Sequence, residues 1–286
     1  MQGIPLFSVL IANYNNGRYL SEAINSVIQQ SYPNWELIIV DDCSTDNSEE
    51  VYSSFQKESR IHVFRNLQNM KCGYTKRRCV ELANSELCGF LDADDVLLPN
   101  ALEIMVRAHF ENPGKSVITS RHYNCDERLS IISESRFLEI PEGLDYFTNG
   151  DYQVEHFAAF RKSCYLKTEG ISSNKPRAID QELYLKLEEV APLMAINDLT
   201  YKYRIYDGSI SHGESGMSAY VWNILVRYEA CIRRNLDISR YSIGDLENKL
   251  TKYKLSLENA YNSKRYKVGS IILKPISLIR SLFYTK

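Results

Sequence analysis

The chain has 286 residues, of which 44% are hydrophobic, and its formal net charge at pH 7 is −2. This length and composition allow a substantial core in one large domain or a domain with an appendage, and they exclude a disordered protein. No nucleic-acid partner is expected, because nucleic-acid binding would call for a basic excess or stripe.

The cysteines and the apolar stretches indicate the compartment. Seven cysteines occur without a CxxC pair, which argues against a disulfide framework and a zinc knuckle. The N-terminus lacks a basic region followed by a long apolar run, and no stretch reaches the roughly 18 uncharged apolar residues of a membrane span. We expect a cytoplasmic protein that is neither secreted nor membrane-spanning.

Short apolar runs alternate with segments of helical spacing in the first half of the chain. In chain order they predict a strand at 7–12, a helix at 20–28, a strand at 37–40, a helix after 46, a strand at 61–64, a helix at 75–83, a strand at 87–91, a helix at 99–110 and a strand at 117–119. This order predicts a Rossmann-like α/β fold with a mostly parallel sheet, helices on both faces and a ligand crevice at the carboxyl ends of the strands.

The second half of the chain is less regular. It predicts a strand at 156–161, a helix at 178–189, extended segments over 194–206 and helical periodicity in 220–231 and 246–257. We therefore expect a helical C-terminal extension after the α/β part.

An apolar strand runs into three carboxylates at Gly89–Asp95. Such a cluster costs stability unless a cation or hydrogen bonds compensate it. Asp92 and Asp94 stand two apart and can hold a hard divalent ion, whose remaining ligands are waters and a substrate diphosphate. The alternative is an Asp-rich turn that caps the helix beginning near Pro99.

Three blocks follow one another along the chain: Ser8–Asn15 (SVLIANYN), Glu36–Asp46 (ELIIVDDCSTD) and Leu91–Asp95 (LDADD). In this order they resemble the family 2 glycosyltransferases, and the resemblance extends from about residue 5 to about residue 211. It implies a GT-A fold, a UDP-sugar donor, inversion at the transferred sugar, a Mn²⁺ or Mg²⁺ cofactor, and a glycan or lipid-linked acceptor in bacterial surface-polysaccharide assembly.

The resemblance also divides the chain. It implies a GT-A domain over 1–213, with a nucleotide-sugar-binding half at 1–120 and an acceptor half at 121–213. The remaining 214–286 would form the helical extension.

The resemblance assigns donor-binding residues to the strand ends. These are Ala12, Tyr14, Asn15, Asp41, Asp42, Arg78, Asp92, Ala93 and Arg204. A carboxylate at Asp41 or Asp42 can accept the uracil imide N–H or a ribose hydroxyl, although a helix N-cap is the plainer interpretation. For Arg78, and still more for Lys76 and Arg77, the plainer interpretation is a solvated basic helix face.

The resemblance also assigns the metal ligands and the base. Asp92 and Asp94 would hold the ion, with Asp95 as a direct or indirect partner and His212 as a further candidate, unless His212 is an ordinary loop residue. Asp180 matches the family aspartate that deprotonates the acceptor hydroxyl, although Ile179 stands where a glutamate is usual. Asp180 could instead cap a helix, and Glu182 is the alternative base.

The segment 262–286 contains six basic residues and no acidic residue, interleaved with isoleucine, leucine and phenylalanine. Such a segment can lie on an anionic membrane surface, here the inner face of the cell membrane, or it can pack on the protein or a partner subunit. A dinucleotide-dependent oxidoreductase is disfavoured because no GxGxxG follows the first strand. A catalytically inactive, glycosyltransferase-like binding or scaffold protein remains the alternative function.

Overall fold

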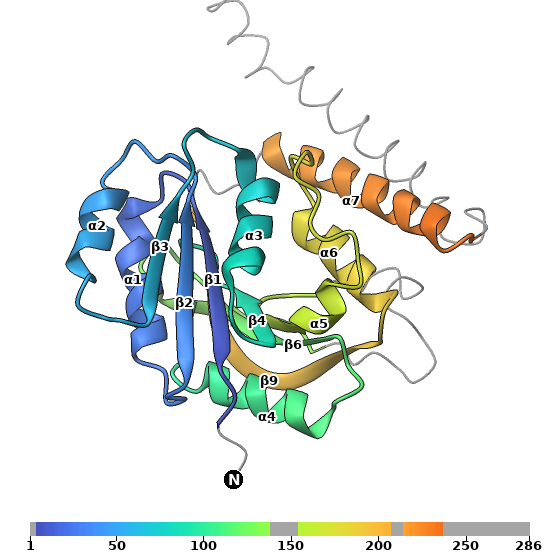
Figure 1. The fold of residues 1–286 in the computed structure, drawn as a ribbon, viewed down its shortest axis with the longest axis horizontal. Helices are drawn as coiled ribbons and strands as arrows, with labels where there is room; N and C mark the ends of the chain where they lie inside the picture. Colours follow the sequence, from blue (N-terminus) through green and yellow to red (C-terminus); the bar gives the residue numbers. More distant parts are fainter. Residues whose placement is uncertain (1–3, 138–153, 207–213, 237–286) are drawn as a thin grey trace, which may run out of the picture. The chain divides into compact units, whose positions relative to one another are not determined.

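Nine strands of the described residues form a single sheet in the computed structural model, which describes residues 4–137, 154–206 and 214–236 (Figure 1). The strands are β1 Phe7–Asn13, β2 Trp35–Asp41, β3 Ile61–Arg65, β4 Leu87–Phe90, β5 Val96–Leu97, β6 Val117–Cys125, β7 Ile131–Glu134, β8 Ala158–Arg161 and β9 Leu193–Arg204. The helices of the same residues are α1 Gly17–Ile28, α2 Ser48–Ser54, α3 Lys71–Leu82, α4 Ala101–Glu111, α5 Lys162–Tyr165, α6 Ile179–Glu188 and α7 Glu214–Arg233.

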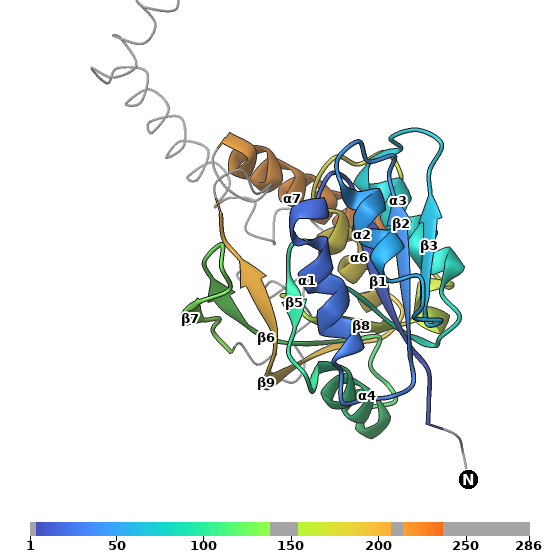
Figure 2. The same cartoon turned by 90° about the vertical axis from the view of Figure 1, so that its left-hand side faces the viewer.

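The sheet changes character after its fourth strand. Its order is β3-β2-β1-β4-β8-β6-β9-β5, with β7 beside β6. The first four strands run parallel, as βαβ crossovers require. Beyond them β8 is antiparallel to β4 and to β6, while β9 is parallel to β6. The predicted α/β class with the GT-A arrangement is confirmed, and the second half of the sheet has mixed direction (Figure 2).

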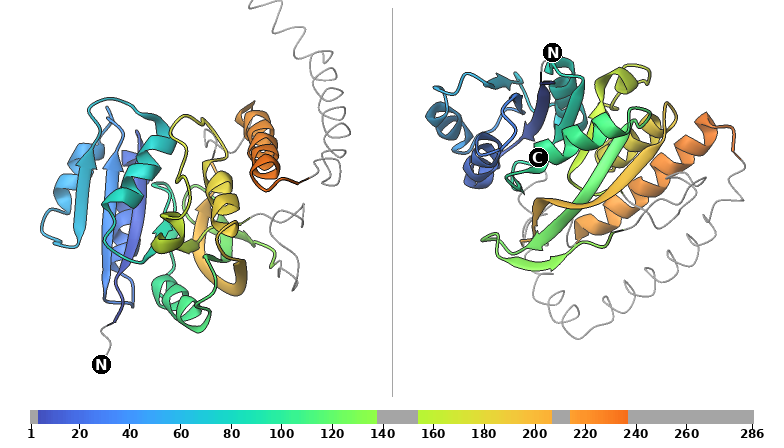
Figure 3. Two further views of the ribbon diagram at one scale, coloured as in Figure 1. Left: turned by 45° about the vertical axis from the view of Figure 1, so that its right-hand side comes forward. Right: turned by 90° about the horizontal axis from the view of Figure 1, so that it is seen from below.

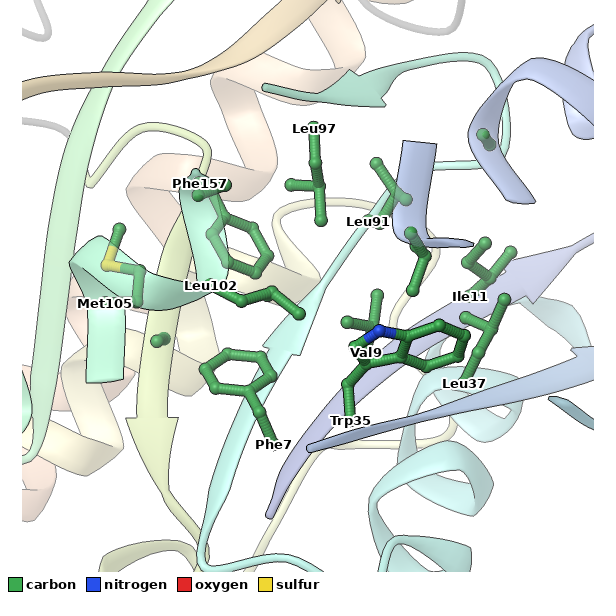
Figure 4. Packing of buried hydrophobic residues seen from close by; sticks show 14 of the residues in the cluster. Phe7, Val9, Ile11, Trp35, Leu37, Leu91, Leu97, Leu102, Met105 and Phe157 are labelled. Carbon is green, nitrogen blue, oxygen red and sulfur yellow. The ribbon is translucent and has the colours of Figure 1, made fainter. Parts of the chain in front are cut away.

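Strands β1 and β2 bury both of their faces, which explains their continuous apolar sequences. Phe7, Val9 and Ile11 of β1 belong to a cluster that also contains buried residues of α1 and α4 (Figure 4). The alternate residue Leu10 is equally buried but lies outside this cluster. It faces the side on which α3 packs against β1 and β2, because successive strand residues point to opposite faces.

The two ends of the β2 strand differ in chemistry. Trp35 begins the strand, is 2% exposed and lies under the guanidinium of Arg60, 3.7 Å from the ring centroid. Asp41 ends the strand among polar side chains. The apolar end therefore anchors the sheet, and the polar end is free to take part in a site.

Helix α7 packs against α6 (Figure 3). It belongs to the same compact unit as the sheet, and this unit ends at Leu236. The helical periodicity predicted within 220–231 is confirmed by α7. The periodicity at 246–257 and the basic segment 262–286 lie outside the described residues. None of the helices in the described ranges combines the length and the apolar character that a membrane span requires.

Candidate active site

The carboxyl ends of β1, β2 and β4 meet at one edge of the sheet (Figure 1). In the parallel ladders Asn13 pairs with Asp41, and Leu10 pairs with Phe90, two residues before Asp92. Most of the residues predicted to bind the nucleotide sugar therefore gather here.

Asp41 lies inside a polar network and is 2% exposed. Its Oδ2 accepts hydrogen bonds from the hydroxyl of Tyr52 at 2.9 Å and from the amide of Asn13 at 3.3 Å. Its Oδ1 accepts the backbone N–H of Ser44 at 2.8 Å. The carboxylate thus fixes the turn after β2, but it does not cap α2, whose N-cap residue is Asn47.

Asp42 ties the turn after β2 to the start of α3. Its Oδ1 accepts hydrogen bonds from Asn66 at 2.7 Å and from the backbone N–H of Met70 at 2.7 Å. Its Oδ2 accepts only one hydrogen bond from the described residues, the backbone N–H of Lys71 at 2.8 Å. A carboxylate oxygen has two lone pairs, so Asp42 keeps acceptor capacity that a ligand can use.

The rim beside these carboxylates is formed by the turn after β1. Tyr14 is 48% exposed, Ala12 is half-buried, and Asn15 adopts the left-handed conformation with φ 54°. The side-chain oxygen of Asn15 accepts the backbone N–H of Thr45 at 2.8 Å, which joins the turns after β1 and β2. The exposed ring of Tyr14 is therefore held beside a braced pair of turns.

Asp92, Asp94 and Asp95 follow β4 in a tight turn around the buried Ala93. The turn closes with a hydrogen bond from the Asp95 N–H to the Asp92 carbonyl at 3.1 Å. Asp95 is buried and accepts hydrogen bonds from the Tyr201 hydroxyl at 2.8 Å and the Arg204 N–H at 2.7 Å. Asp95 therefore supports the turn, whereas the side chains of Asp92 and Asp94 remain half-buried.

The electrostatics of the turn differ between its carboxyl groups. Burial and the charge of Asp92 raise the pKa of Asp94. Burial, together with the charges of Asp94 and Asp92, raises the pKa of Asp95 well above its usual value. Burial alone would raise the pKa of Asp92, but the electrostatic effects of Lys76 and His156 outweigh burial and lower it. The turn is thus a region of crowded negative charge that a cation stabilises.

Lys76 of α3 supplies one such cation and corrects the sequence interpretation. The sequence favoured a solvated position, yet Lys76 is 5% exposed. Its Nζ lies 2.8 and 2.9 Å from the carboxylate oxygens of Asp180 and 3.4 Å from Oδ1 of Asp92. Burial lowers the pKa of Lys76, but Asp180 and Asp92 outweigh that effect and raise it well above its usual value.

Lys76 therefore connects the acidic turn to the predicted base. Asp180 lies in the first turn of α6, and 31% of its side chain is exposed. It is more than 80 residues from Asp92 in sequence, so the sequence alone could not show that the two carboxylates share one ammonium group. The helical spacing of α3 offered a weak signal, because Lys76 and the buried Cys79 and Val80 lie three and four residues apart on one helix face.

His156 and Tyr206 are two further site residues that sequence reasoning missed. The Nε2 of His156 lies 3.5 Å from Oδ2 of Asp92, and its ring stacks on Tyr201 with centroids 5.4 Å apart. The hydroxyl of Tyr206 donates to Oδ2 of Asp94 at 2.9 Å. The resemblance had pointed to the nearby Arg204 and not to Tyr206.

The two predicted phosphate-binding arginines contact protein atoms in this structure. Arg78 donates to the Arg65 carbonyl at 3.0 Å and to the side-chain oxygen of Asn66 at 2.5 Å. Arg204 is buried, and each of its three guanidinium nitrogens donates to a protein oxygen, those of Asp94, Glu127 and Glu22. Arg204 therefore braces the acidic turn, and its part in nucleotide-sugar binding stays a prediction.

Two predicted site residues remain, Glu182 and His212. Glu182, the alternative base, is 1% exposed and bonds to Ser172 and Lys186 on the side of α6 away from Asp180. His212 lies outside the described residues. Of the two possible bases, only Asp180 reaches the acidic turn through Lys76.

The acidic turn provides some, but not all, of the ligands that a hard divalent ion needs. Asp92 and Asp94 offer carboxylate oxygens of the kind that Mg²⁺ and Mn²⁺ bind, and burial and the charge of Asp92 raise the pKa of Asp94. Among the described residues no group of three or more histidine, cysteine or acidic side chains could hold an ion alone. An ion at this turn would need further ligands from a bound diphosphate and water.

Comparisons with known proteins agree on one family and one fold. The chain is 27% identical over 277 residues to glycosyltransferase GlyG of Streptococcus pneumoniae serotype 4, covering 88% of this chain and 89% of GlyG. It is 32% identical over 143 residues to TuaG of Bacillus subtilis, a glycosyltransferase named for teichuronic acid biosynthesis, covering 50% of this chain and 56% of TuaG.

Solved structures show the same fold. TarS 1–349 of S. aureus in complex with UDP-GlcNAc superposes with a TM-score of 0.62 at 19% identity, over 77% of this chain and 65% of that chain. The chain thus spans less than two thirds of TuaG and of the TarS fragment. The model of glycosyl transferase family 2 matches residues 8–167, more than half of the chain. This match, on a GT-A fold with acidic residues at the carboxyl ends of its strands, shows that the chain belongs to glycosyl transferase family 2.

Proposed function

We propose that this family 2 glycosyltransferase is an inverting, metal-dependent enzyme that uses a UDP-sugar. Its acceptor would be a hydroxyl of a glycan or lipid-linked intermediate in surface-polysaccharide assembly. The observation that carries the proposal is the position of the buried Lys76 ammonium between Asp92 and Asp180. This one ammonium group contacts both a proposed metal ligand and the proposed base. The UDP-GlcNAc bound to TarS and the name of TuaG support the choice of donor and pathway.

Asp180 is the proposed base. In an inverting transfer the acceptor oxygen forms a bond to the anomeric carbon as the bond from that carbon to the diphosphate oxygen breaks, and the hydroxyl proton passes to a carboxylate. Asp180 is half-buried and lies on the rigid first turn of α6, so it is oriented before the acceptor arrives. Its partner Lys76 donates hydrogen bonds to both carboxylate oxygens and so helps to orient them.

The departing diphosphate needs positive charge, and Lys76 supplies part of it in this proposal. An ammonium held in a dry site stabilises developing negative charge more strongly than one in water. Asp92 and Asp94 would hold Mn²⁺ or Mg²⁺, which acts as a Lewis acid on the phosphate oxygens. The nucleotide would lie along the rim of Ala12, Tyr14 and Asn15, with Asp42 offering its unused lone pair.

A panel of nucleotide sugars with Mn²⁺ tests the proposed activity through UDP release. We expect one UDP-sugar to turn over and Lys76→Met to lower kcat/KM about 10-fold or more, since it removes a charge-assisted contact. Arg77→Met is the matched control, because Arg77 is exposed and pairs only with Glu81 among the described residues. Binding of UDP without turnover of any donor would favour the inactive scaffold instead.

Calorimetry tests the metal assignment separately. The UDP affinity of the wild type should rise when Mn²⁺ is added, and the Asp92→Asn, Asp94→Asn double variant should lose this rise, because the carboxylates that would hold the ion are gone. If the double variant keeps the full metal effect, the ion is held elsewhere and Asp92 and Asp94 have another role.

The proposed location is the inner face of the cell membrane, with the basic segment 262–286 as the contact. Its six basic residues would each add about 1 kcal/mol near an anionic surface. The full chain should sediment with anionic vesicles at low salt, and less at high salt because salt screens the attraction. A chain ending at Tyr261 that still sediments would contradict this location.

A further inference from the structure

A loop and three buried charged side chains lie against α6 on the side of the helix away from the candidate active site. The loop connects α5 to α6, and its residues Gly170, Ser172 and Lys175 make the contacts described below. The charged side chains are Lys175, Glu182 and Lys186, of which none is more than 9% exposed. The reaction proposed above uses none of them, and the family model ends before the loop, at residue 167.

Glu182 holds the loop against α6. Its carboxylate accepts hydrogen bonds from the backbone N–H of Ser172 at 3.2 Å and from the Ser172 hydroxyl at 2.5 Å. Lys186, one turn later on α6, bonds to the Gly170 carbonyl at 2.8 Å and lies 3.0 Å from Glu182. Because Asp180 and Glu182 are two residues apart, they point about 200° apart around the helix axis. The helix is therefore fixed by Lys76 on one side and by the loop on the other.

The same loop also touches α3, the helix that carries Lys76. The backbone of Gly73 packs directly against the Ser172 carbonyl, so closely that a Cβ at residue 73 would overlap the carbonyl oxygen. Gly73 lies three residues before Lys76, almost one helical turn. The loop thus sets the distance between α3 and α6, and with it the separation of Lys76 and Asp180.

Helix α7 joins this arrangement through Lys175. The Nζ of Lys175 lies 2.6 and 2.7 Å from the two carboxylate oxygens of Glu229 on α7, and 3.8 Å from Glu182 on α6. Lys175 is a link from α7 to the N-terminal end of α6. A second link, between Arg233 and Glu189 at 2.8 Å, joins α7 to the C-terminal end of α6, away from the base.

We propose that Lys175 and Glu229 are positioning residues, through which α7 holds Asp180 at the distance from Lys76 that proton transfer requires. This inference rests on the proposed function, because it takes Asp180 as the base. The geometry explains why charges are buried here: an ion pair with several hydrogen bonds fixes one arrangement of three helices more strictly than apolar contacts, which tolerate sliding.

The test is a kinetic comparison using the UDP-sugar that gives the fastest UDP release. Glu229→Gln removes the negative charge of the α7 partner but leaves Lys175 beside Glu182, so we expect the fold to be retained. We expect kcat to fall about 10-fold and KM for the UDP-sugar to change less than about 2-fold, since displacement of a catalytic group by a fraction of an ångström is costly. Arg233→Gln, the matched control on the same helix, should keep the wild-type kcat.

Two double variants separate positioning from general stabilisation. Lys175→Met with Glu229→Gln should lose no more activity than Lys175→Met alone, because the two residues act as one unit. In an Asp180→Asn background, Glu229→Gln should cause no further loss, since the group it positions is already gone. A further loss of about 10-fold in that background would overturn the positioning role.

The proposed function and the positioning role can fail separately. Wild-type turnover by Asp180→Asn would overturn the base assignment and, with it, this inference. A slow Asp180→Asn variant combined with an unchanged kcat for Glu229→Gln would overturn the positioning role alone. An equal loss for Arg233→Gln would also overturn it, because the effect would then belong to the docking of α7 as a whole.

Discussion

Two groups of carboxylates lie near the same edge of the sheet, but they differ in exposure and in their hydrogen-bond partners. Asp41, the last residue of β2, and Asp42 are almost completely buried and accept hydrogen bonds from backbone and neutral side chains; the Arg65 guanidinium also lies 3.7 Å from Asp41. Asp92 and Asp180 each expose about a third of their side chain and share the ammonium of one lysine. The first group shapes the rim, and the second remains accessible to a ligand.

The difference shows that an acidic residue at a strand end does not identify its own role. Neutral donors satisfy a carboxylate and hold a backbone turn in place, which is a structural result. A buried cation between two half-exposed carboxylates leaves acceptor positions open and keeps charge in a dry place, which is what a reaction needs. Asp92 and Asp180 should therefore control the rate, whereas the saturated carboxylate Asp41 should control stability.

The largest effect expected from this comparison is that of Asp180→Asn. A base contributes in the transition state and little in the ground state, so the transfer rate should fall roughly 10²-fold or more. The melting temperature and the UDP affinity should remain close to wild type, because asparagine keeps a hydrogen bond with Lys76. Steady-state kinetics and calorimetry check both parts, and a variant that binds UDP poorly would instead indicate a binding role.

A second prediction concerns His109, a buried histidine whose titration makes the free energy of unfolding depend on pH. Burial lowers the pKa of His109 to about 4, and its Nε2–H donates to the Ala159 carbonyl at 3.0 Å. Between pH 6.5 and 4 the unfolded chain takes up a proton that the folded protein does not, so stability present above pH 6.5 is lost as the pH falls. We expect about 2 kcal/mol to be lost by pH 5.

His109→Gln provides the control for this acid effect, since glutamine can also donate to the carbonyl but does not titrate. Urea unfolding at pH 7 and pH 5 should show a smaller drop for the variant. If the wild type and the variant lose equal stability, the carboxylates alone account for the acid sensitivity.

Tyr52→Phe should affect the hydrogen bonding of Asp41 but not Asp92 or Asp180. The Tyr52 hydroxyl donates to Asp41 and accepts from Asn13 at 2.7 Å, so its removal leaves two buried polar groups with one partner fewer. We expect a loss of roughly 1–2 kcal/mol in the free energy of unfolding, with kcat unchanged. Denaturant unfolding and kinetics of the same sample would show this, and a large fall in kcat would mean that the rim acts in the reaction.

The smallest expected effect is a gain in stability at Cys43. This residue follows Asp42 and adopts the left-handed conformation with φ 65°, which costs an L-residue roughly 1–2 kcal/mol and costs glycine nothing. Cys43→Gly should gain about 1 kcal/mol, less than the strain because a flexible glycine loses more entropy on folding. A lower melting temperature would contradict this prediction and point to packing of the thiol instead.

The sequence predicted local structure well because local patterns determine it. Continuous apolar runs gave β1 and β2, and helical spacing before Pro33 gave α1, whose apolar face is buried as expected. Helix α3 begins at Lys71, four residues before the predicted start, because Asp42 accepts the backbone N–H groups at its N-terminus. That cap comes from a residue 28 positions away from Met70 and is invisible to a local pattern.

The candidate site was predictable only where a motif carried it. The cluster at Asp92 and the helix of Asp180 could be found from short blocks, but the ammonium between them could not. Lys76 belongs to a run of three basic residues, and which of them is buried depends on where α3 meets β4 and α6. His156 and Tyr206 have no flanking pattern, so only the fold brings them to the acidic turn.

The positions of the tryptophans have a spectroscopic consequence. The chain has two. Trp35 is sealed beneath Arg60 at the start of β2, at the opposite end of that strand from Asp41. Trp222 is half-buried on α7, the helix that carries Glu229. A change in tryptophan emission on adding UDP would therefore come from α7 and report its movement, so intrinsic fluorescence offers a label-free view of the helix beside the base.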